Sequence, residues 1–242
     1  MKISKIIRKP LNLIGLDIKK FRPGADYLKF LEKYDIKTVL DIGAHTGQFA
    51  KEIRGKLPQA KIYSFEPLKD CYQELLRNMS GDNNFEFYNF ALGEKEARQE
   101  INRSISSPSS SLLTMGNLHE EMYPHTKGGS REEIEVKRLD DIFKISDLEK
   151  EILVKIDVQG YEDRVIKGGA NIISQAKIIL MENSFLELYK GQALFDDIYE
   201  MMKRLGFRYQ GRIHQRLNPL TGEILYEDSI FVKYPELQNA KN

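Results

Sequence analysis

Residues 39–50, with the sequence VLDIGAHTGQFA, narrow the choice of fold more than any other segment. A short apolar run ends in Asp41, and two glycines, Gly43 and Gly47, then lead into residues that favour a helix. This order is typical of a β-strand that turns sharply into a helix and leaves its backbone open to a ligand. The segment therefore predicts an α/β protein with a ligand site at the end of its first strand.

The neighbouring residues repeat this alternation of apolar strands and amphipathic helices. Residues 23–36 are expected to form a helix ahead of the first strand. The elements expected after it are a strand at 37–43, a helix at 46–57, a strand at 60–67, a helix at 68–79 and a strand at 84–93. Strands that alternate with helices build a parallel sheet through right-handed crossovers.

The second half of the chain adds strands to this sheet. The expected elements are strands at 133–139, 151–158 and 176–183 and helices at 140–145, 161–169 and 195–207. Two late strands, 208–217 and 223–234, flank the turn NPLTGE and predict an antiparallel hairpin at the sheet edge. Residues 24–235 are therefore expected to form a single domain.

Residues 101–133 differ from the rest because they are rich in Ser, Gly and Pro and show no clear period. We expect a long loop over about 103–131, and a loop of this length in a compact domain is usually a functional lid or disordered. Because binding sites favour loops, residues 104–131 are expected to help select the substrate.

The bulk composition gives no support for a nucleic-acid binder, since the formal net charge is +1. The single cysteine, Cys71, excludes an intrachain disulfide, and its place in an expected helix favours a packing role. No apolar run approaches the ~18 residues of a membrane span. We therefore expect a cytoplasmic protein.

Residues 1–23 form a basic arm in which Asp17 is the single acidic residue. Apolar residues such as Ile3, Ile6 and Ile7 are spaced like one face of a helix. The arm either rests on an anionic membrane surface or a partner, or packs on the domain with its lysines in solvent. Residues 236–242 are expected to be a C-terminal tail.

The glycine turn does not match a dinucleotide or nucleoside triphosphate site. A dinucleotide fingerprint requires G-x-G-x-x-G, and Asp41 stands where the first glycine would lie. An anion at this point would repel a pyrophosphate but would suit a ligand with a cationic amino group, which also disfavours a dehydrogenase. No Gly-Lys-Ser/Thr follows, which excludes a P-loop.

Glu66 ends the second expected strand, 66 − 43 = 23 residues after Gly43. An acid at this position can accept both hydroxyls of a ribose. A ribonucleoside with a positive, non-phosphorylated tail therefore fits, and S-adenosylmethionine has these parts. Each residue also has a purely structural explanation, with Gly43 and Gly47 as turn glycines and Glu66 as a helix cap.

The chain as a whole resembles the FkbM-type methyltransferases of the class I S-adenosylmethionine-dependent fold. The matching segments, over about 38 to 233, are DIGAHTG, SFEP, NFALG, SSSLL, VKIDVQGYEDRVIKGG, IILMEN and DSIFVKY. The resemblance implies a Rossmann-like α/β fold with a seven-stranded, mostly parallel sheet, helices on both faces and an antiparallel edge strand. It also implies methyl transfer to a hydroxyl, often of a sugar or a natural-product scaffold.

The resemblance further implies which residues contact the cofactor. These are Asp41, Gly43, Ala44 and Gly47 at the methionine tail, Glu66 at the ribose, Pro67, Phe90 and Ala91 at the adenine, Ser111 in a covering loop and Asp157 between cofactor and acceptor. His45 departs from the family, which often has asparagine or another small polar residue there, and it receives no role.

Methyl transfer to a hydroxyl needs a base for the proton and an oxygen held about 3 Å from the methyl group. Such a base is expected at the carboxyl ends of the strands. The catalytic candidates are Asp157, Glu182 and Glu162, and Glu162 can equally complement the dipole of the helix that it opens. Asp157, Glu182 and Asn183 also resemble the metal site of catechol-type O-methyltransferases, so a divalent metal is kept as a less favoured alternative.

Three histidines lie outside the matching segments. His119 and His125 are interpreted as loop residues, because their spacing in a flexible loop suits a metal poorly. His214 either faces the acceptor as a base or lies on the surface of an edge strand.

The leading hypothesis is an S-adenosylmethionine-dependent O-methyltransferase that acts on a small-molecule or glycan acceptor. An N- or macromolecule methyltransferase and a non-catalytic cofactor-binding module are the alternatives. The sequence identifies neither the acceptor nor the oligomeric state.

Overall fold

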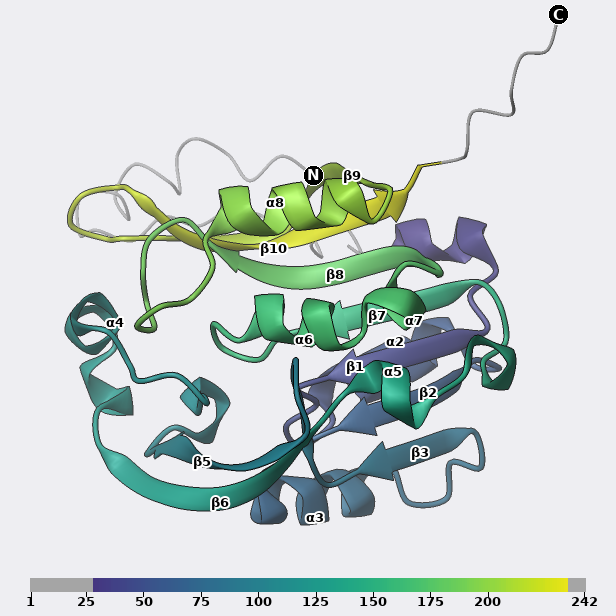
Figure 1. Ribbon diagram of the computed structural model, residues 1–242, viewed down its shortest axis with the longest axis horizontal. Helices are drawn as coiled ribbons and strands as arrows, with labels where there is room; N and C mark the ends of the chain where they lie inside the picture. The colour runs from purple at the N-terminus through teal and green to yellow at the C-terminus, as the bar shows by residue number, and fades with distance from the viewer. Residues whose placement is uncertain (1–27, 235–242) are drawn as a thin grey trace, which may run out of the picture.

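The computed structural model describes residues 28–234, so the predicted N-terminal arm and the C-terminal tail lie outside the described residues. Within this range a seven-stranded sheet crosses the molecule in the order β3-β2-β1-β7-β8-β10-β9 (Figure 1). Its strands are β3 (Phe85–Tyr88), β2 (Lys61–Phe65), β1 (Thr38–Ile42), β7 (Ile152–Ile156), β8 (Ala176–Ser184), β10 (Ile224–Lys233) and β9 (Phe207–Leu217).

The strand directions confirm the predicted fold class. The pairs β3–β2, β2–β1, β1–β7 and β7–β8 are parallel. The late hairpin is antiparallel, and β10 lies between β8 and the edge strand β9. The reversal lets two consecutive strands complete the sheet without a further crossover helix.

Helices cover both faces of this sheet, which explains why its central strands are apolar almost throughout. One face carries α5 (Leu139–Ile142), α6 (Glu162–Gly168), α7 (Ala170–Ile173) and α8 (Phe195–Arg204). The other carries α2 (Gln48–Lys56), α3 (Lys69–Asn78) and the 3₁₀ helix η1 (Lys29–Tyr34), where the sequence predicted a longer helix. A further 3₁₀ turn is η4 (Ile145–Asp147).

Adjacent residues of the central strands point into two separate cores. Leu40 and Val154 pack with α5 to α8 in one core, whereas Val39 and Leu153 pack with α2 and η1 in the other. All four side chains are completely buried. Because both faces of the central strands are buried in these cores, a ligand can reach the sheet only at the ends of the strands.

The predicted long loop differs from what the structure contains there. A second sheet, in the order β4-β6-β5, consists of β4 (Ala91–Leu92), β5 (Ala97–Ser104) and β6 (Gly129–Lys137). The connection from β5 to β6 holds η2 (Ser107–Ser109), α4 (Asn117–Met122) and η3 (Pro124–Thr126). This sheet and α4 extend to one side of the main sheet (Figure 1).

The sequence pattern of these strands is weak because one side of the second sheet remains polar. Its few apolar residues, Ile101, Ile134 and Val136, pack with Leu68 and Cys71 in a small core of their own. Cys71 is therefore buried, as its predicted packing role requires, and burial raises the pKa of its thiol to about 11.

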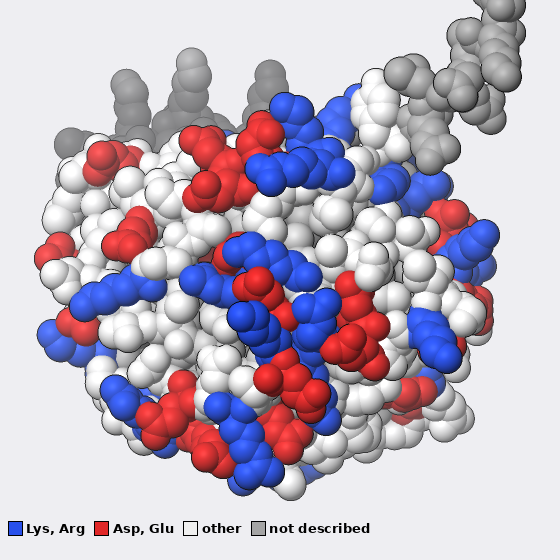
Figure 2. Space-filling model, in the orientation of Figure 1, with Lys and Arg blue, Asp and Glu red and all other residues white. Residues whose placement is uncertain are grey.

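The surface offers no charge field of a single sign on the face shown in Figure 2, where Lys and Arg alternate with Asp and Glu. Between residues 28 and 234, none of the helices combines the length and hydrophobicity that a membrane span needs.

Candidate active site

A cavity of about 420 Å³ opens at the carboxyl ends of β1, β2, β7 and β8. Residues of the segment 107–112, between β5 and β6, form part of its wall. The predicted site residues on this wall are Gly43, Ala44, Glu66, Pro67, Ala91, Ser111, Asp157 and Glu182. Those away from the wall are Asp41, Gly47, Phe90 and Glu162.

The turn after β1 leaves no room for a side chain at either of its two glycines, Gly43 and Gly47. Gly43 has φ +77°, and a Cβ there would lie 1.9 Å from the carbonyl oxygen of Asp157. Gly47 has φ +88° and a Cβ there would lie 2.6 Å from Leu75. The amides of Gly43 and Ala44 both donate to the carbonyl of Phe65 at 3.0 Å. These bonds tie the turn to β2 and open a backbone cradle toward the cavity.

Asp41 lies beneath this cradle and is completely buried. Its Oδ2 accepts a hydrogen bond from the Ser64 hydroxyl at 3.2 Å, and its Oδ1 lies 3.5 Å from Lys155 Nζ. Burial raises the pKa of Asp41, and the positive charge of Lys155 opposes that rise. Asp41 therefore holds the Lys155 ammonium beneath the turn, and it does not line the cavity.

Glu66 ends β2 with both carboxylate oxygens facing backbone donors. Its Oε2 accepts from the amide of His45 and its Oε1 from the amide of Leu68, both at 2.9 Å. Burial raises the pKa of Glu66 to about 7. Each oxygen keeps a further lone pair, so the carboxylate can accept ribose hydroxyls without losing these bonds.

His45, to which the sequence assigned no role, lies on the cavity wall beside Glu66. It adopts φ +49°, and its ring Nε2 lies 2.7 Å from the Ser107 hydroxyl. The ring thus connects the glycine turn to the segment that covers the cavity. The turn position of His45 is the signal that could have identified it.

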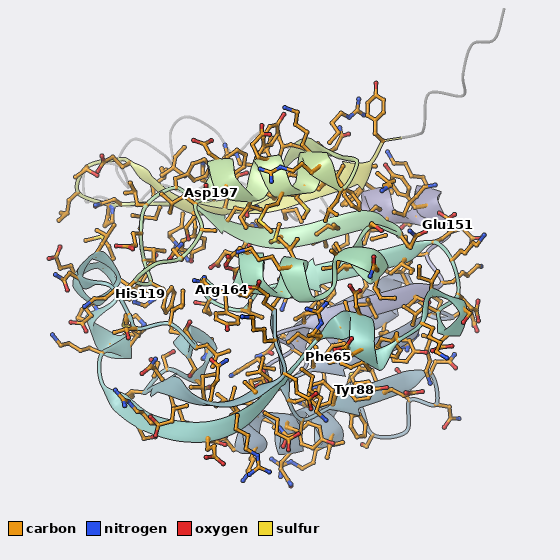
Figure 3. The ribbon with its side chains drawn as sticks, in the orientation of Figure 1. Phe65, Tyr88, His119, Glu151, Arg164 and Asp197 are labelled. Atoms are coloured by element: carbon orange, nitrogen blue, oxygen red, sulfur yellow. The ribbon has the colours of Figure 1, made fainter. Side chains whose placement is uncertain are left out.

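Phe90 belongs to an aromatic cluster behind the cavity. Its ring centroid lies 5.9 Å from that of Phe65 and 5.6 Å from that of Tyr88, and the two partners stack at 5.0 Å (Figure 3). Lys137 Nζ lies 4.6 Å from the Phe90 ring centroid. The adjacent Ala91 reaches the cavity wall.

Three carboxylates line the other half of the cavity. Asp157 follows the end of β7, Glu182 lies near the end of β8, and Asp228 pairs directly with Glu182 in the β8–β10 register. Burial, reinforced by the charge of Asp157, raises the pKa of Glu182 well above its usual range. Burial also raises the pKa of Asp228. Carboxylates on neighbouring strands thus share one wall.

Gln159, which the sequence interpretation missed, joins two of these acids. Its Nε2 donates to Asp157 Oδ1 at 2.8 Å and lies 3.4 Å from Glu182 Oε1. Its Oε1 accepts from the Tyr189 hydroxyl at 2.9 Å, and its backbone carbonyl accepts from Ser111 Oγ at 2.6 Å. Gln159 has φ +57°, a conformation that a non-glycine residue keeps only when its surroundings hold it.

Lys155 is the second residue that the sequence interpretation missed. Its Nζ donates to the carbonyl of Gly43 at 2.7 Å and lies 3.6 Å from Asp157 Oδ2. Burial lowers the pKa of Lys155, but the charges of Asp157 and Asp41 outweigh this effect and raise it overall. A lysine inside the otherwise apolar strand ILVKI was the signal for this role.

Glu162 turns back from the start of α6 onto the loop before it. Its Oε1 accepts from the amides of Val158 and Gly160, at 3.1 and 3.2 Å. The side chain is buried, and burial raises its pKa to about 7. The structure thus places Glu162 in a loop-closing contact behind Gln159.

The histidines fall into different environments. His119 lies on α4 and is buried, with Nε2 3.3 Å from the Tyr189 hydroxyl, instead of lying in an open loop (Figure 3). Burial lowers the pKa of His119. His125 is exposed in η3, and His214 reaches the cavity wall near Asp228.

The described residues contain no cluster of three or more His, Cys, Asp or Glu side chains that could hold a metal ion. The Asn183 side chain, part of the less favoured metal hypothesis, is buried with its amide 3.4 Å from the Met181 carbonyl and does not line the cavity.

The mostly parallel sheet, the glycine turn after β1, the acid at the end of β2 and the cavity across their ends are the features expected of the class I methyltransferase fold. The family model described as the Methyltransferase FkbM domain matches residues 41–209. The chain therefore belongs to the FkbM methyltransferase family. The protein is a methyltransferase, and membership in this family implies S-adenosylmethionine as methyl donor.

Curated relatives agree with this assignment. The 2-O-methyltransferase NoeI of Sinorhizobium fredii is 27% identical over 181 residues, which cover 72% of this chain and 74% of the relative. Methyltransferase sdnD of Sordaria araneosa is 27% identical over 70% of this chain and 73% of its own length. A solved structure of methyltransferase FkbM from Methylobacillus flagellatus is 15% identical, with a TM-score of 0.49 over 82% of this chain and 44% of that one.

Proposed function

We propose that this protein transfers a methyl group from S-adenosylmethionine to a hydroxyl of a carbohydrate or a natural-product-like acceptor. The observation that carries the proposal is the pair of carboxylates, Asp157 and Glu182, held together by Gln159 on the wall of the cavity. The name of the relative NoeI, a 2-O-methyltransferase, supports oxygen as the acceptor atom.

The half of the cavity around Gly43 and Glu66 fits the donor. The turn at Gly43 packs directly against the Asp157 carbonyl and leaves Gly43 and Ala44 on the cavity wall, where the amino-acid tail can lie, and Glu66 supplies acceptors for the ribose. The donor, when bound, supplies an electrophilic methyl group on a sulfonium. Ser107, whose hydroxyl lies 2.7 Å from His45 Nε2, and Ser111 lie on the cavity wall and help to exclude water.

The half around Asp157 and Glu182 suits the removal of a hydroxyl proton. Burial and the Asp157 charge raise the pKa of Glu182, so its carboxylate is a stronger base than an exposed glutamate. Gln159 holds the two carboxylates in fixed positions, and Lys155 holds Asp157 from the other side. We infer that Glu182 accepts the proton while Asp157 orients the hydroxyl.

The test is product analysis with donor that carries a deuterated methyl group. Purified enzyme, the labelled donor and an extract of hydroxylated metabolites and glycans from the source organism should give ether-linked label at an oxygen. Label on nitrogen or on a macromolecule would support the alternative methyltransferase assignments. Tight donor binding without any transfer would support the non-catalytic module.

Two variants refine the test. Glu182→Gln keeps the shape of the side chain but removes the base, so the rate of transfer should fall by about 10²–10⁴-fold. Affinity for S-adenosylhomocysteine, measured by calorimetry, should stay within about threefold, because Glu182 lies in the other half of the cavity.

A further inference from the structure

Acidic side chains outnumber basic side chains in the half of the cavity around Asp157 and Glu182, which we call the acceptor half. Its wall carries the carboxylates of Asp157, Glu182 and Asp228. The basic side chains on the whole wall are Lys155, His45 and His214. The acceptor half therefore has more acidic than basic side chains.

Lys155 does not correct this excess because its charge is already engaged. The ammonium donates to the Gly43 carbonyl at 2.7 Å and lies 3.5 and 3.6 Å from the carboxylates of Asp41 and Asp157. Its side chain is only 13% exposed. An anionic substituent on the acceptor would have to displace Asp41 or Asp157 to reach it.

Asp228 is the group most free to contact an acceptor. In the part of the chain from 28 to 234, no side chain or amide donates a hydrogen bond to its carboxylate, and His214 is the histidine near it on the cavity wall. It is half-buried, and it faces the cavity from β10 in direct register with Glu182. Hydroxyl and ammonium groups are donors that would satisfy it, whereas carboxylate and phosphate groups cannot.

We propose that the acceptor ring is uncharged or cationic, as in a neutral sugar or an amino sugar, and that rings bearing a carboxylate or phosphate are rejected. This inference rests on the proposed function. A donor sulfonium offsets one negative charge of the cavity, and an anionic substituent on the acceptor would still meet the carboxylate of Asp228. At an effective dielectric of about 20, one like charge within several ångströms weakens binding by about ten- to a hundredfold.

The first test identifies the methylated ring. The deuterated label is transferred by the full-length enzyme into an extract of the source organism, the products are hydrolysed, and O-methyl monosaccharides are identified by mass spectrometry. Labelled neutral or amino sugars are expected. Labelled O-methyl uronic acids or sugar phosphates would overturn this inference and leave the proposed O-methyl transfer intact, whereas absence of ether-linked label would overturn both.

The second test assigns the discrimination to Asp228. The acceptor found in the first test is compared with an analogue in which one ring substituent is a carboxylate. For the wild type, kcat/KM should favour the uncharged acceptor by about ten- to a hundredfold. Asp228→Asn should reduce this ratio severalfold, and the matched control Asp196→Asn, on the exposed surface of α8, should leave it unchanged. An equal ratio in wild type and Asp228→Asn would contradict the assignment.

Discussion

The two halves of the cavity are built in different ways. The half that we propose for the donor, the donor half, consists mainly of backbone, the turn of Gly43 and Ala44, with one carboxylate, Glu66, whose oxygens both accept from amides. The half that we propose for the acceptor, the acceptor half, consists of side chains from separate strands: Gln159 joins Asp157 to Glu182, and Asp228 pairs with Glu182 in the strand register. A backbone cradle leaves little freedom for sequence change, whereas a wall of side chains can be altered one residue at a time.

Gly43→Ala is expected to have the largest effect, because its side chain has no room between the turn of the donor half and the backbone of Asp157. The new Cβ would lie 1.9 Å from the carbonyl oxygen of Asp157, so the turn or the backbone of Asp157 must shift. Gly43 also has φ +77°, a conformation that is strained for alanine. Overpacking and positive-φ strain together should lower the free energy of unfolding by about 3–5 kcal/mol. Thermal melts should show the loss, and calorimetry should show no binding of S-adenosylhomocysteine.

Gly55→Ala is the matched control within α2. A Cβ there would meet no heavy atom within 4 Å, and alanine favours a helix over glycine by about 1 kcal/mol. Its melting temperature should equal or exceed that of the wild type. If Gly43→Ala behaved in the same way, the close approach of the turn to the backbone of Asp157 would be refuted.

Glu66→Ala is expected to have the next largest effect, confined to the donor half. Loss of charged hydrogen bonds to the ribose should weaken S-adenosylhomocysteine binding by about a hundredfold. Glu74→Ala, an exposed residue on the neighbouring helix α3, is the control and should bind normally. Unchanged affinity in Glu66→Ala would remove Glu66 from the site.

The same residue predicts a pH dependence of binding. Burial raises the pKa of Glu66 to about 7, and the ionised carboxylate is the better acceptor for ribose hydroxyls. Affinity for S-adenosylhomocysteine should therefore fall as pH drops below about 7 and level off above it. Glu66→Gln should bind more weakly at pH 8 and show a flatter profile across this interval.

The contrast between the halves also explains what the sequence could predict. The donor half could be predicted because its elements follow one another directly in the sequence. A strand, a glycine turn and a helix place Gly43 and Ala44 at the cavity, and the end of β2 places Glu66 on the same wall. The main sheet was predictable for the same reason, since apolar runs that are buried on both faces stand out. The strand predicted at 133–139 overlaps β6, but it was wrongly assigned to the main sheet. The second sheet was missed because its strands leave one face polar and share only a small core.

The acceptor half was predicted only in part because it depends on contacts between distant segments. Asp157 and Glu182 were found as acids at strand ends, but the Asp228–Glu182 pairing requires the register of an antiparallel strand. Gln159 and Tyr189 meet across 30 residues of sequence. No local period encodes that contact, so a single sequence does not reveal it.

Gln159→Leu tests the acceptor half and should have an intermediate effect. Leucine keeps the volume but removes the amide that donates to Asp157 and Glu182. The two carboxylates would lose their shared donor, so kcat should fall by about tenfold, while affinity for S-adenosylhomocysteine changes less than about threefold. Gln175→Leu, at an exposed position after α7, is the control and should keep both values. A loss of donor affinity equal to the loss of kcat would show that the two halves are not separable.

Glu162→Gln should have the smallest effect on catalysis, although Glu162 was a catalytic candidate from sequence. Only Oε1 accepts the amides of Val158 and Gly160, and glutamine retains that oxygen. The value of kcat should therefore stay within about twofold of the wild type. A fall in kcat as large as that of Gln159→Leu would instead place Glu162 in the chemistry.

The effect of Glu162→Gln on stability depends on pH in a defined direction. Burial raises the folded-state pKa of Glu162 from 4.5 to about 7, so between these values the folded state binds its proton more tightly than the unfolded chain does. The contribution of Glu162 to stability is thus complete below about pH 4.5 and is lost as pH rises to about 7. Glutamine carries no such proton, so melts should show Glu162→Gln gaining stability relative to the wild type from pH 5 to pH 8. A constant difference over this range would mean that Glu162 is ionised in the folded protein, and the loop before α6 would then be held by a buried charge.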